Sequence, residues 1–86
     1  MLYKIIIVTY DGNGNQHREY YAVDAFPPYN SEKIITNNCW TCIQSDRFGD
    51  FYLRDNQLIF IDLDVDGIVP DGYKYITVDE LGKLLI

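Results

Sequence analysis

Three aspartates at alternate positions, Asp62, Asp64 and Asp66, are the residues of this 86-residue chain whose spacing most resembles a site. With Gly67 they match the opening of a calcium loop, which places oxygen ligands at positions 1, 3 and 5 and a glycine at position 6. The remainder of that loop departs from the pattern, because position 12 is Tyr73 where a bidentate glutamate is needed. A calcium-binding module with these three ligands is therefore an alternative hypothesis.

The same aspartates also fit a β-strand with one face in water. Successive side chains of a strand point to opposite faces, so Ile59 and Ile61 would face the core while the aspartates face solvent. We interpret the row as the solvent edge of this strand. Carboxylates about 7 Å apart can receive Lys and Arg side chains from a partner. The predicted partner-binding residues are Asp62, Asp64, Asp66, Asp71 and Tyr73.

The Cys39-Trp-Thr-Cys42 motif supplies two thiolates, whereas a structural zinc site needs four ligands. Residues three apart on a strand point to opposite faces about 10 Å apart, which is too far for a disulfide. We predict two ordinary half-buried cysteines, with a zinc ion shared across a dimer as the less favoured interpretation.

The sequence contains no recognisable arrangement of catalytic residues. His17 is the single histidine, and beside Arg18 in a predicted hairpin arm it is expected to be an exposed polar residue. No G-x-S-x-G nucleophile turn occurs, and no pair of carboxylates is set apart for acid–base work. We therefore expect a protein that is not an enzyme and that needs no cofactor.

Aromatic residues are abundant, with eight Tyr, four Phe and one Trp. Tyr20 and Tyr21 must point to opposite faces of a strand, so one of them is expected to face outward. Tyrosines are enriched at interface hot spots. The apolar C-terminus, Leu84 to Ile86, should either dock on the core or join an interface.

An N-terminal β-hairpin is predicted over Tyr3–Tyr10 and Gln16–Phe26, because Asn13-Gly14 between β-rich runs is a strong turn signal. Pro27-Pro28 should end the second strand, and a short helix or a loop should follow over Ser31–Thr36. Three further strands are predicted over Cys39–Ser45, Phe51–Arg54 and Leu58–Val65, with a candidate sixth over Tyr73–Ile76.

A C-terminal helix is predicted to begin after Thr77, because Thr77 and Glu80 have the spacing of a capping box. Val78, Leu81 and Leu85 would then face the sheet. The fold class that follows is α+β: residues 1–86 form a single domain, a small antiparallel sheet of about five strands with a short helix packed on it.

The net charge of −6 lies mostly in the second half of the chain, where residues 46–86 carry nine acidic against four basic residues. This balance disfavours direct nucleic-acid binding and anionic membranes, which both require basic patches. It is compatible with a basic protein surface or a metal cation. No apolar run is long enough to cross a bilayer and no signal peptide is recognisable, so we expect a cytoplasmic protein with reduced cysteines.

These observations favour a small acidic binding protein whose partner presents a basic surface. One specific version is a viral or mobile-element inhibitor that blocks the nucleic-acid-binding surface of a host nuclease or defence protein; the Ile, Tyr and Asn bias fits a low-GC bacterium or its virus. The alternatives are the calcium-binding module and a structural or self-assembling subunit, which would make the chain a homo-oligomer.

Overall fold

The computed structural model describes residues 2–24, 38–46, 49–64 and 67–86. The predicted N-terminal hairpin is confirmed: β1 (Leu2–Tyr10) pairs antiparallel with β2 (Gln16–Asp24) along its whole length. In the turn, the Asp11 carboxylate accepts hydrogen bonds from the backbone N–H groups of Asn13 (2.8 Å) and Asn15 (2.9 Å). Gly14 takes a positive φ of 85° there, a conformation that glycine adopts without steric cost.

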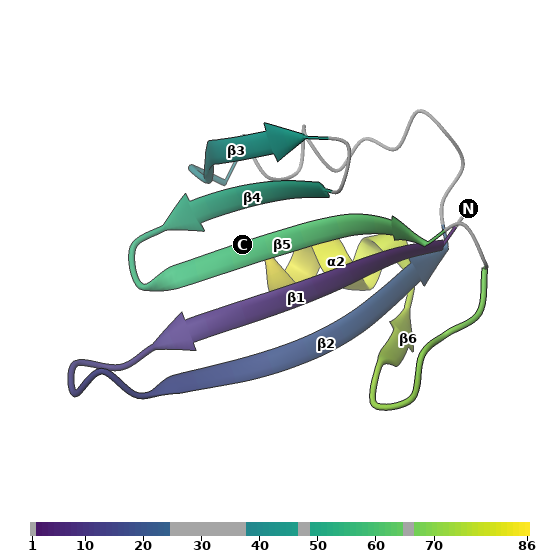
Figure 1. The fold of residues 1–86 in the computed structure, drawn as a ribbon, viewed down its shortest axis with the longest axis horizontal. Helices are drawn as coiled ribbons and strands as arrows, with labels where there is room; N and C mark the ends of the chain where they lie inside the picture. Colours follow the sequence, from purple (N-terminus) through teal and green to yellow (C-terminus); the bar gives the residue numbers. More distant parts are fainter. Residues whose placement is uncertain (1, 25–37, 47–48, 65–66) are drawn as a thin grey trace.

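Four more strands complete one sheet: β3 (Thr41–Asp46), β4 (Gly49–Arg54), β5 (Gln57–Asp64) and β6 (Lys74–Ile76). Their spatial order is β3-β4-β5-β1-β2-β6 (Figure 1). The expectation of about five antiparallel strands was wrong in two respects, because the sheet has six strands and β6 runs parallel to β2.

The parallel pairing of β6 follows from the turn that precedes it. β5 and β2 both end at the same end of the sheet, since each is antiparallel to β1. After β5 the chain turns back through Pro70 to Tyr73, where the Tyr73 N–H donates to the Pro70 carbonyl (3.1 Å) and Gly72 has a φ of 85°. The chain then re-enters the sheet in the direction of β2.

β5 lies inside the sheet, between β4 and β1. The interpretation of Asp62 and Asp64 as the solvent edge of a strand was therefore wrong. Alternating apolar and polar residues show that a strand has two unlike faces, but they do not distinguish an edge strand from an internal one. The edges of the described sheet are β3 and β6.

The C-terminal helix α2 (Val78–Leu84) begins as predicted. The Glu80 N–H donates to the Thr77 hydroxyl (3.1 Å), and the Thr77 N–H donates to the Glu80 carboxylate (3.2 Å), which completes the capping box. Leu81 and Leu85 are fully buried and Val78 packs against the same cluster, so the predicted sheet-facing side of the helix is confirmed. Figure 1 shows α2 lying across one face of the sheet.

Arg54, at the end of β4, connects the C-terminus to the sheet through hydrogen bonds. Its guanidinium donates to the carbonyls of Asn38 (2.8 Å) and Leu85 (2.9 Å) and lies 4.3 Å from the ring centroid of Trp40. The indole N–H of Trp40 donates to the same Leu85 carbonyl (3.1 Å). The Leu85 carbonyl, which the end of the short helix leaves without an intrahelical donor, thus accepts two hydrogen bonds. The apolar C-terminus therefore docks on the core through Leu85.

Some expectations lie outside the described residues, namely Pro27-Pro28, the short helix over Ser31–Thr36 and the end of the second strand beyond Asp24. Within the parts of the chain that the structure describes, no helix is long and apolar enough to cross a membrane.

Candidate protein interface

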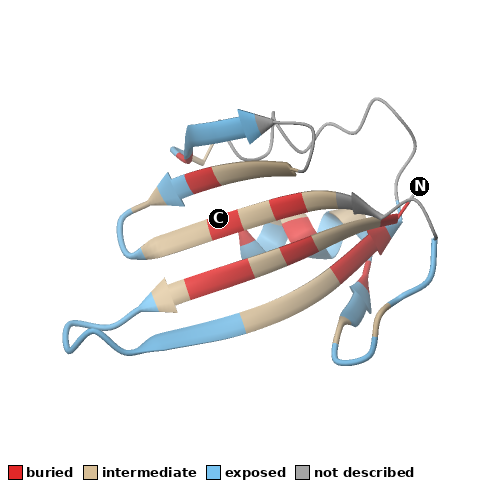
Figure 2. Cartoon of the chain, in the orientation of Figure 1, coloured by how far each residue is buried: buried red, intermediate tan, exposed pale blue. Residues whose placement is uncertain are grey.

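The two faces of the sheet are covered unequally. Ile5, Ile59 and Val23 are completely buried in the core cluster that also contains Leu81 of α2. Figure 2 shows buried segments on β1, β5 and β2. We call the opposite face the open face, because no described helix or strand packs on it. Strand parity and register assign to it the alternate residues Leu2, Lys4, Ile6, Val8, Tyr10, Arg18, Tyr20, Ala22, Asp24, Phe51, Leu53, Leu58, Phe60, Asp62 and Tyr75. Of these, Leu2, Val8 and Ala22 are buried among their neighbours, and the others are partly or fully exposed.

The centre of the open face is apolar and aromatic. Phe51, Phe60, Ile6 and Tyr20 stand opposite one another on four consecutive strands, in one row across the sheet. The rings of Phe51 and Phe60 lie 4.6 Å apart at an angle of 32°. A Cβ added at Gly49 would lie 2.6 Å from the Phe60 ring and from the Ile61 carbonyl, so this glycine permits the close approach of β4. All four side chains of the row remain partly exposed.

Three tyrosines extend this surface over β2 and β6. The Tyr20 ring packs edge-on against the Tyr73 ring, with centroids 5.3 Å apart. Tyr75 stands beside Ala22, which is completely buried, while Tyr75 itself is 56% exposed. Ile68 and Val69 are also exposed, in the segment that leads from β5 to β6. The tyrosines thus add hydroxyl-bearing, half-exposed rings to one side of the apolar row.

One corner of the open face carries a carboxylate whose negative charge is paired with a lysine of the same face. The Lys4 ammonium lies 3.7 Å from the Asp62 carboxylate, and each of these side chains is about one-third exposed, at 31% and 30%. The register also places Asp24 and Asp64 on either side of Leu2, at the end of the same three strands. The negative charge of Asp62 is therefore partly compensated by a lysine from β1, far away in the sequence.

The diagonally opposite corner of the open face carries Arg18, which is exposed and stands across from Val8. The Arg18 side chain donates one hydrogen bond, from Nε to the Gln16 amide oxygen (2.9 Å). Among the described residues it forms no ion pair with a carboxylate. Its guanidinium therefore keeps donors available for a carboxylate from another molecule.

The predicted partner-binding residues are partly brought together. Asp62 lies at the corner of the open face, and Tyr73 reaches the same face through its contact with Tyr20. Asp71 is exposed in the turn before β6, the backbone of Asp64 is in register with Leu2, and Asp66 lies outside the described residues.

Sequence reasoning missed the apolar row and Tyr75. A signal was present in β1, where Ile5 to Val8 are apolar without interruption. A continuous run of this kind indicates a strand whose two faces are both apolar.

The groups that could do chemistry are dispersed. No cluster of three or more His, Cys, Asp or Glu side chains occurs among the described residues. His17 is exposed as expected, with a side-chain exposure of 74%. A hydrogen bond to Glu19 raises the pKa of Tyr21 to about 12, and backbone hydrogen bonds from Asn13 and Asn15 lower the pKa of Asp11. Both shifts have local causes within the first hairpin.

Cys39 and Cys42 are free thiols, and both are exposed. The expectation of half-buried cysteines was therefore wrong. Cys39 precedes β3 in a turn with a φ of 65°, and Cys42 lies on an edge strand, so neither thiol has a packed layer above it. A zinc ion held by the two cysteines of each copy in a dimer stays a prediction.

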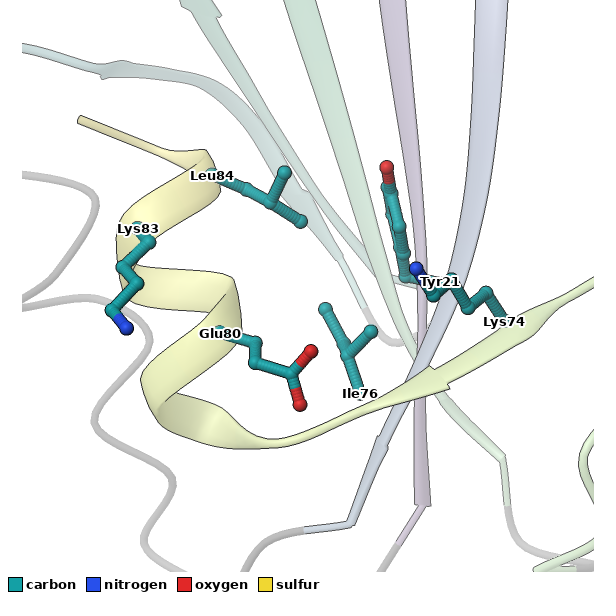
Figure 3. Close-up of a pocket in the computed structure, with 6 residues that line it drawn as sticks. All are labelled: Tyr21, Lys74, Ile76, Glu80, Lys83 and Leu84. Carbon is teal, nitrogen blue, oxygen red and sulfur yellow. The ribbon is translucent and has the colours of Figure 1, made fainter.

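A cavity of about 280 Å³ lies on the other side of the sheet, where α2 meets β2 and β6 (Figure 3). It is lined by Tyr21, Lys74, Ile76, Glu80, Lys83 and Leu84. Two of its polar groups are already engaged, because Glu80 caps the helix and the Tyr21 hydroxyl donates to Glu19. Figure 3 shows the Lys83 ammonium turned away from the cavity. The cavity is thus a shallow, mostly apolar hollow with a single lysine, Lys74, at its mouth.

Comparisons with known proteins add no assignment. The chain matches no family model, and searches of curated proteins and of solved structures returned no match.

Proposed function

We propose that this chain is a non-enzymatic protein-binding module and that the open face is its interface. The observation that carries the proposal is an aromatic and aliphatic sheet face with no described element packed on it. Leu53 and Tyr75 on this face are 42% and 56% exposed, so their burial by a partner would remove apolar surface from water. Such burial is worth roughly 25 cal/mol per Å² before the costs of association.

The composition of the open face also supports this function. Protein interfaces combine an aromatic centre that has few charges with a polar rim, and tyrosine is enriched at their hot spots. Here Phe51, Phe60 and Ile6 form the centre. The rim consists of Tyr20, Tyr73 and Tyr75 on one side and of charged residues at two corners.

The partner that fits this face presents an apolar surface with a basic group placed to meet Asp62. That carboxylate is only 30% exposed and already lies beside Lys4, so a partner arginine would share it rather than occupy a bare acidic patch. Asp71, in the turn before β6 at the far edge of the sheet, is a second exposed carboxylate. An inhibitor that covers a nucleic-acid-binding surface would be one partner relationship of this kind, and it remains a prediction.

Two leucines with equal exposure test the proposal. Leu53 on the open face and Leu84 on α2 are both 42% exposed, so Leu53→Lys and Leu84→Lys change equally accessible side chains on opposite sides of the sheet. Tagged wild-type and variant chains would be used for quantitative affinity capture from cells that express the protein. Each recovered partner would then be titrated against the purified chains. We expect Leu53→Lys to weaken binding by at least about tenfold, because it places a charge on the open face directly beside the apolar centre.

The expected effect of Leu84→Lys on the same titration is less than about twofold, since it lies away from the interface. Circular dichroism would show whether both variants keep the fold. Equal loss of binding in the two variants, or a loss confined to Leu84→Lys, would contradict the proposal.

A further inference from the structure

We propose that a second copy of this chain can occupy the open face, so that two sheets pack face to face about a twofold axis. This inference rests on the proposed function, because it names the partner of the same interface. The required partner presents an apolar surface with a basic group near it. The chain itself has both features, since Arg18 lies on the open face beside Val8, and Leu58 follows Val8 on the next strand.

The positions of Asp62 and Arg18 are related through Ile6. On β5, Phe60 pairs with Ile6, and Asp62 lies two residues further on, opposite Lys4. On β2, Tyr20 pairs with Ile6, and Arg18 lies two residues before it, opposite Val8 and therefore toward the other end of β1. With strands about 4.8 Å apart and a rise of about 3.4 Å per residue, both Cα atoms lie roughly 8 Å from that of Ile6, in opposite directions.

This geometry makes the face complementary to itself. A twofold axis that lies in the plane of the interface above Ile6, perpendicular to the Asp62–Arg18 diagonal, places Arg18 of each copy over Asp62 of the other. The strands of the two sheets then cross at roughly 70°, which is nearer to the orthogonal than to the aligned way for sheets to pack. The aromatic rows of the two copies meet at the centre, and two equivalent ion pairs form at the corners.

The charge of the chain does not prevent this arrangement. Among the described side chains of the open face, the positive charges of Lys4 and Arg18 are matched in number by the negative charges of Asp24 and Asp62. The interface therefore contains little of the net charge of −6. Acidic residues elsewhere, such as Asp79 on α2, would lie on the outer sides of the two sheets, where salt screens charges beyond about 8 Å.

Reciprocal charge reversal tests the arrangement. Sedimentation equilibrium of the full chain would be measured from micromolar to millimolar concentration at physiological salt. We expect wild-type dimers, and we expect Asp62→Arg and Arg18→Asp each to raise the dimer dissociation constant at least about tenfold, because each variant homodimer contains two like-charge contacts. Asp79→Arg and Lys83→Glu on α2 are the charge-matched controls, and they should leave the constant within about twofold.

Mixing the two single variants should restore association, because the heterodimer contains two opposite-charge pairs. The double variant Asp62→Arg/Arg18→Asp should also dimerise by itself, which keeps the test valid if one single variant folds poorly. A chain that stays monomeric at millimolar concentration overturns the inference, as does a dimer that neither reversal weakens. If the chain is monomeric but a captured partner is still lost with Leu53→Lys, the proposed function stands and this inference fails.

Discussion

The two faces of the sheet are built from the same strands and nearly the same kinds of residue, yet among the described elements only α2 packs on the sheet, and it covers one face. On the α2 side, Ile5 and Ile59 are completely buried beneath Leu81 and Leu85. On the open face, Phe60 and Leu58 remain partly exposed. The comparison shows that a short helix can complete one face of a six-stranded sheet and leave an apolar surface available on the other.

Among matched substitutions on the two faces, a pair of leucines should give the largest difference in the free energy of unfolding. Leu81 is completely buried under the sheet, whereas Leu53 on the open face is 42% exposed. Leu81→Ala should lower the free energy of unfolding by about 3 kcal/mol, because it leaves a cavity in the core. Leu53→Ala should lower it by less than about 1 kcal/mol. Denaturant unfolding at low micromolar concentration measures both, and similar losses would mean that the open face is also a core.

Replacing a pair of arginines by alanine should give a difference in the free energy of unfolding in the same direction, but a smaller one. Arg54 donates to the carbonyls of Asn38 and Leu85 and covers the Trp40 ring, so Arg54→Ala should lower the free energy of unfolding by about 2 kcal/mol. Arg18 makes one exposed hydrogen bond, and Arg18→Ala should change stability by less than about 0.5 kcal/mol. Thermal unfolding of the dilute variants tests this, and an Arg54→Ala chain as stable as wild type would show that the C-terminus is held by other contacts.

The smallest expected effect concerns Tyr21, on the α2 side, whose pKa is raised to about 12 by its hydrogen bond to Glu19. Because the folded-state pKa exceeds the unfolded value near 10, this bond contributes stability below pH 10 and loses that contribution as the pH rises through 12. Ultraviolet absorbance during an alkaline titration should show one late phenol that disappears in Tyr21→Phe.

The conservative change Glu19→Gln removes the acceptor charge that favours the protonated phenol, so it should move the late transition of Tyr21 toward pH 10. A late transition that persists in Tyr21→Phe would assign it to a different tyrosine.

Local signals in the sequence predicted local structure well. Asn13-Gly14 identified the first hairpin, and the Thr77 and Glu80 pair identified the start of α2, because these signals act through backbone groups a few residues away. The side of α2 that faces the sheet followed from helical spacing. Tyr20 and Tyr21 also separated to opposite faces as strand geometry requires.

Features that depend on long-range pairing were not predictable in this way. The parallel pairing of β6 depends on where β2 ends, and the internal position of β5 depends on its two neighbours. The partner of Asp62 is Lys4, which the register of β1 and β5 brings beside it. The candidate interface is made of such register relations, so the sequence indicated Asp62 and Tyr73 but not the apolar row between them.

The most direct test of the open face as an interface is a methyl-detected nuclear magnetic resonance spectrum of the chain, recorded free and in its complex with a second copy or a captured partner. We expect the signals of Ile6, Leu53 and Leu58 to shift on complex formation, while those of Leu81 and Leu84 stay in place. Shifts that gather on α2 and leave the open-face methyl groups unchanged in the saturated complex would contradict the proposed interface.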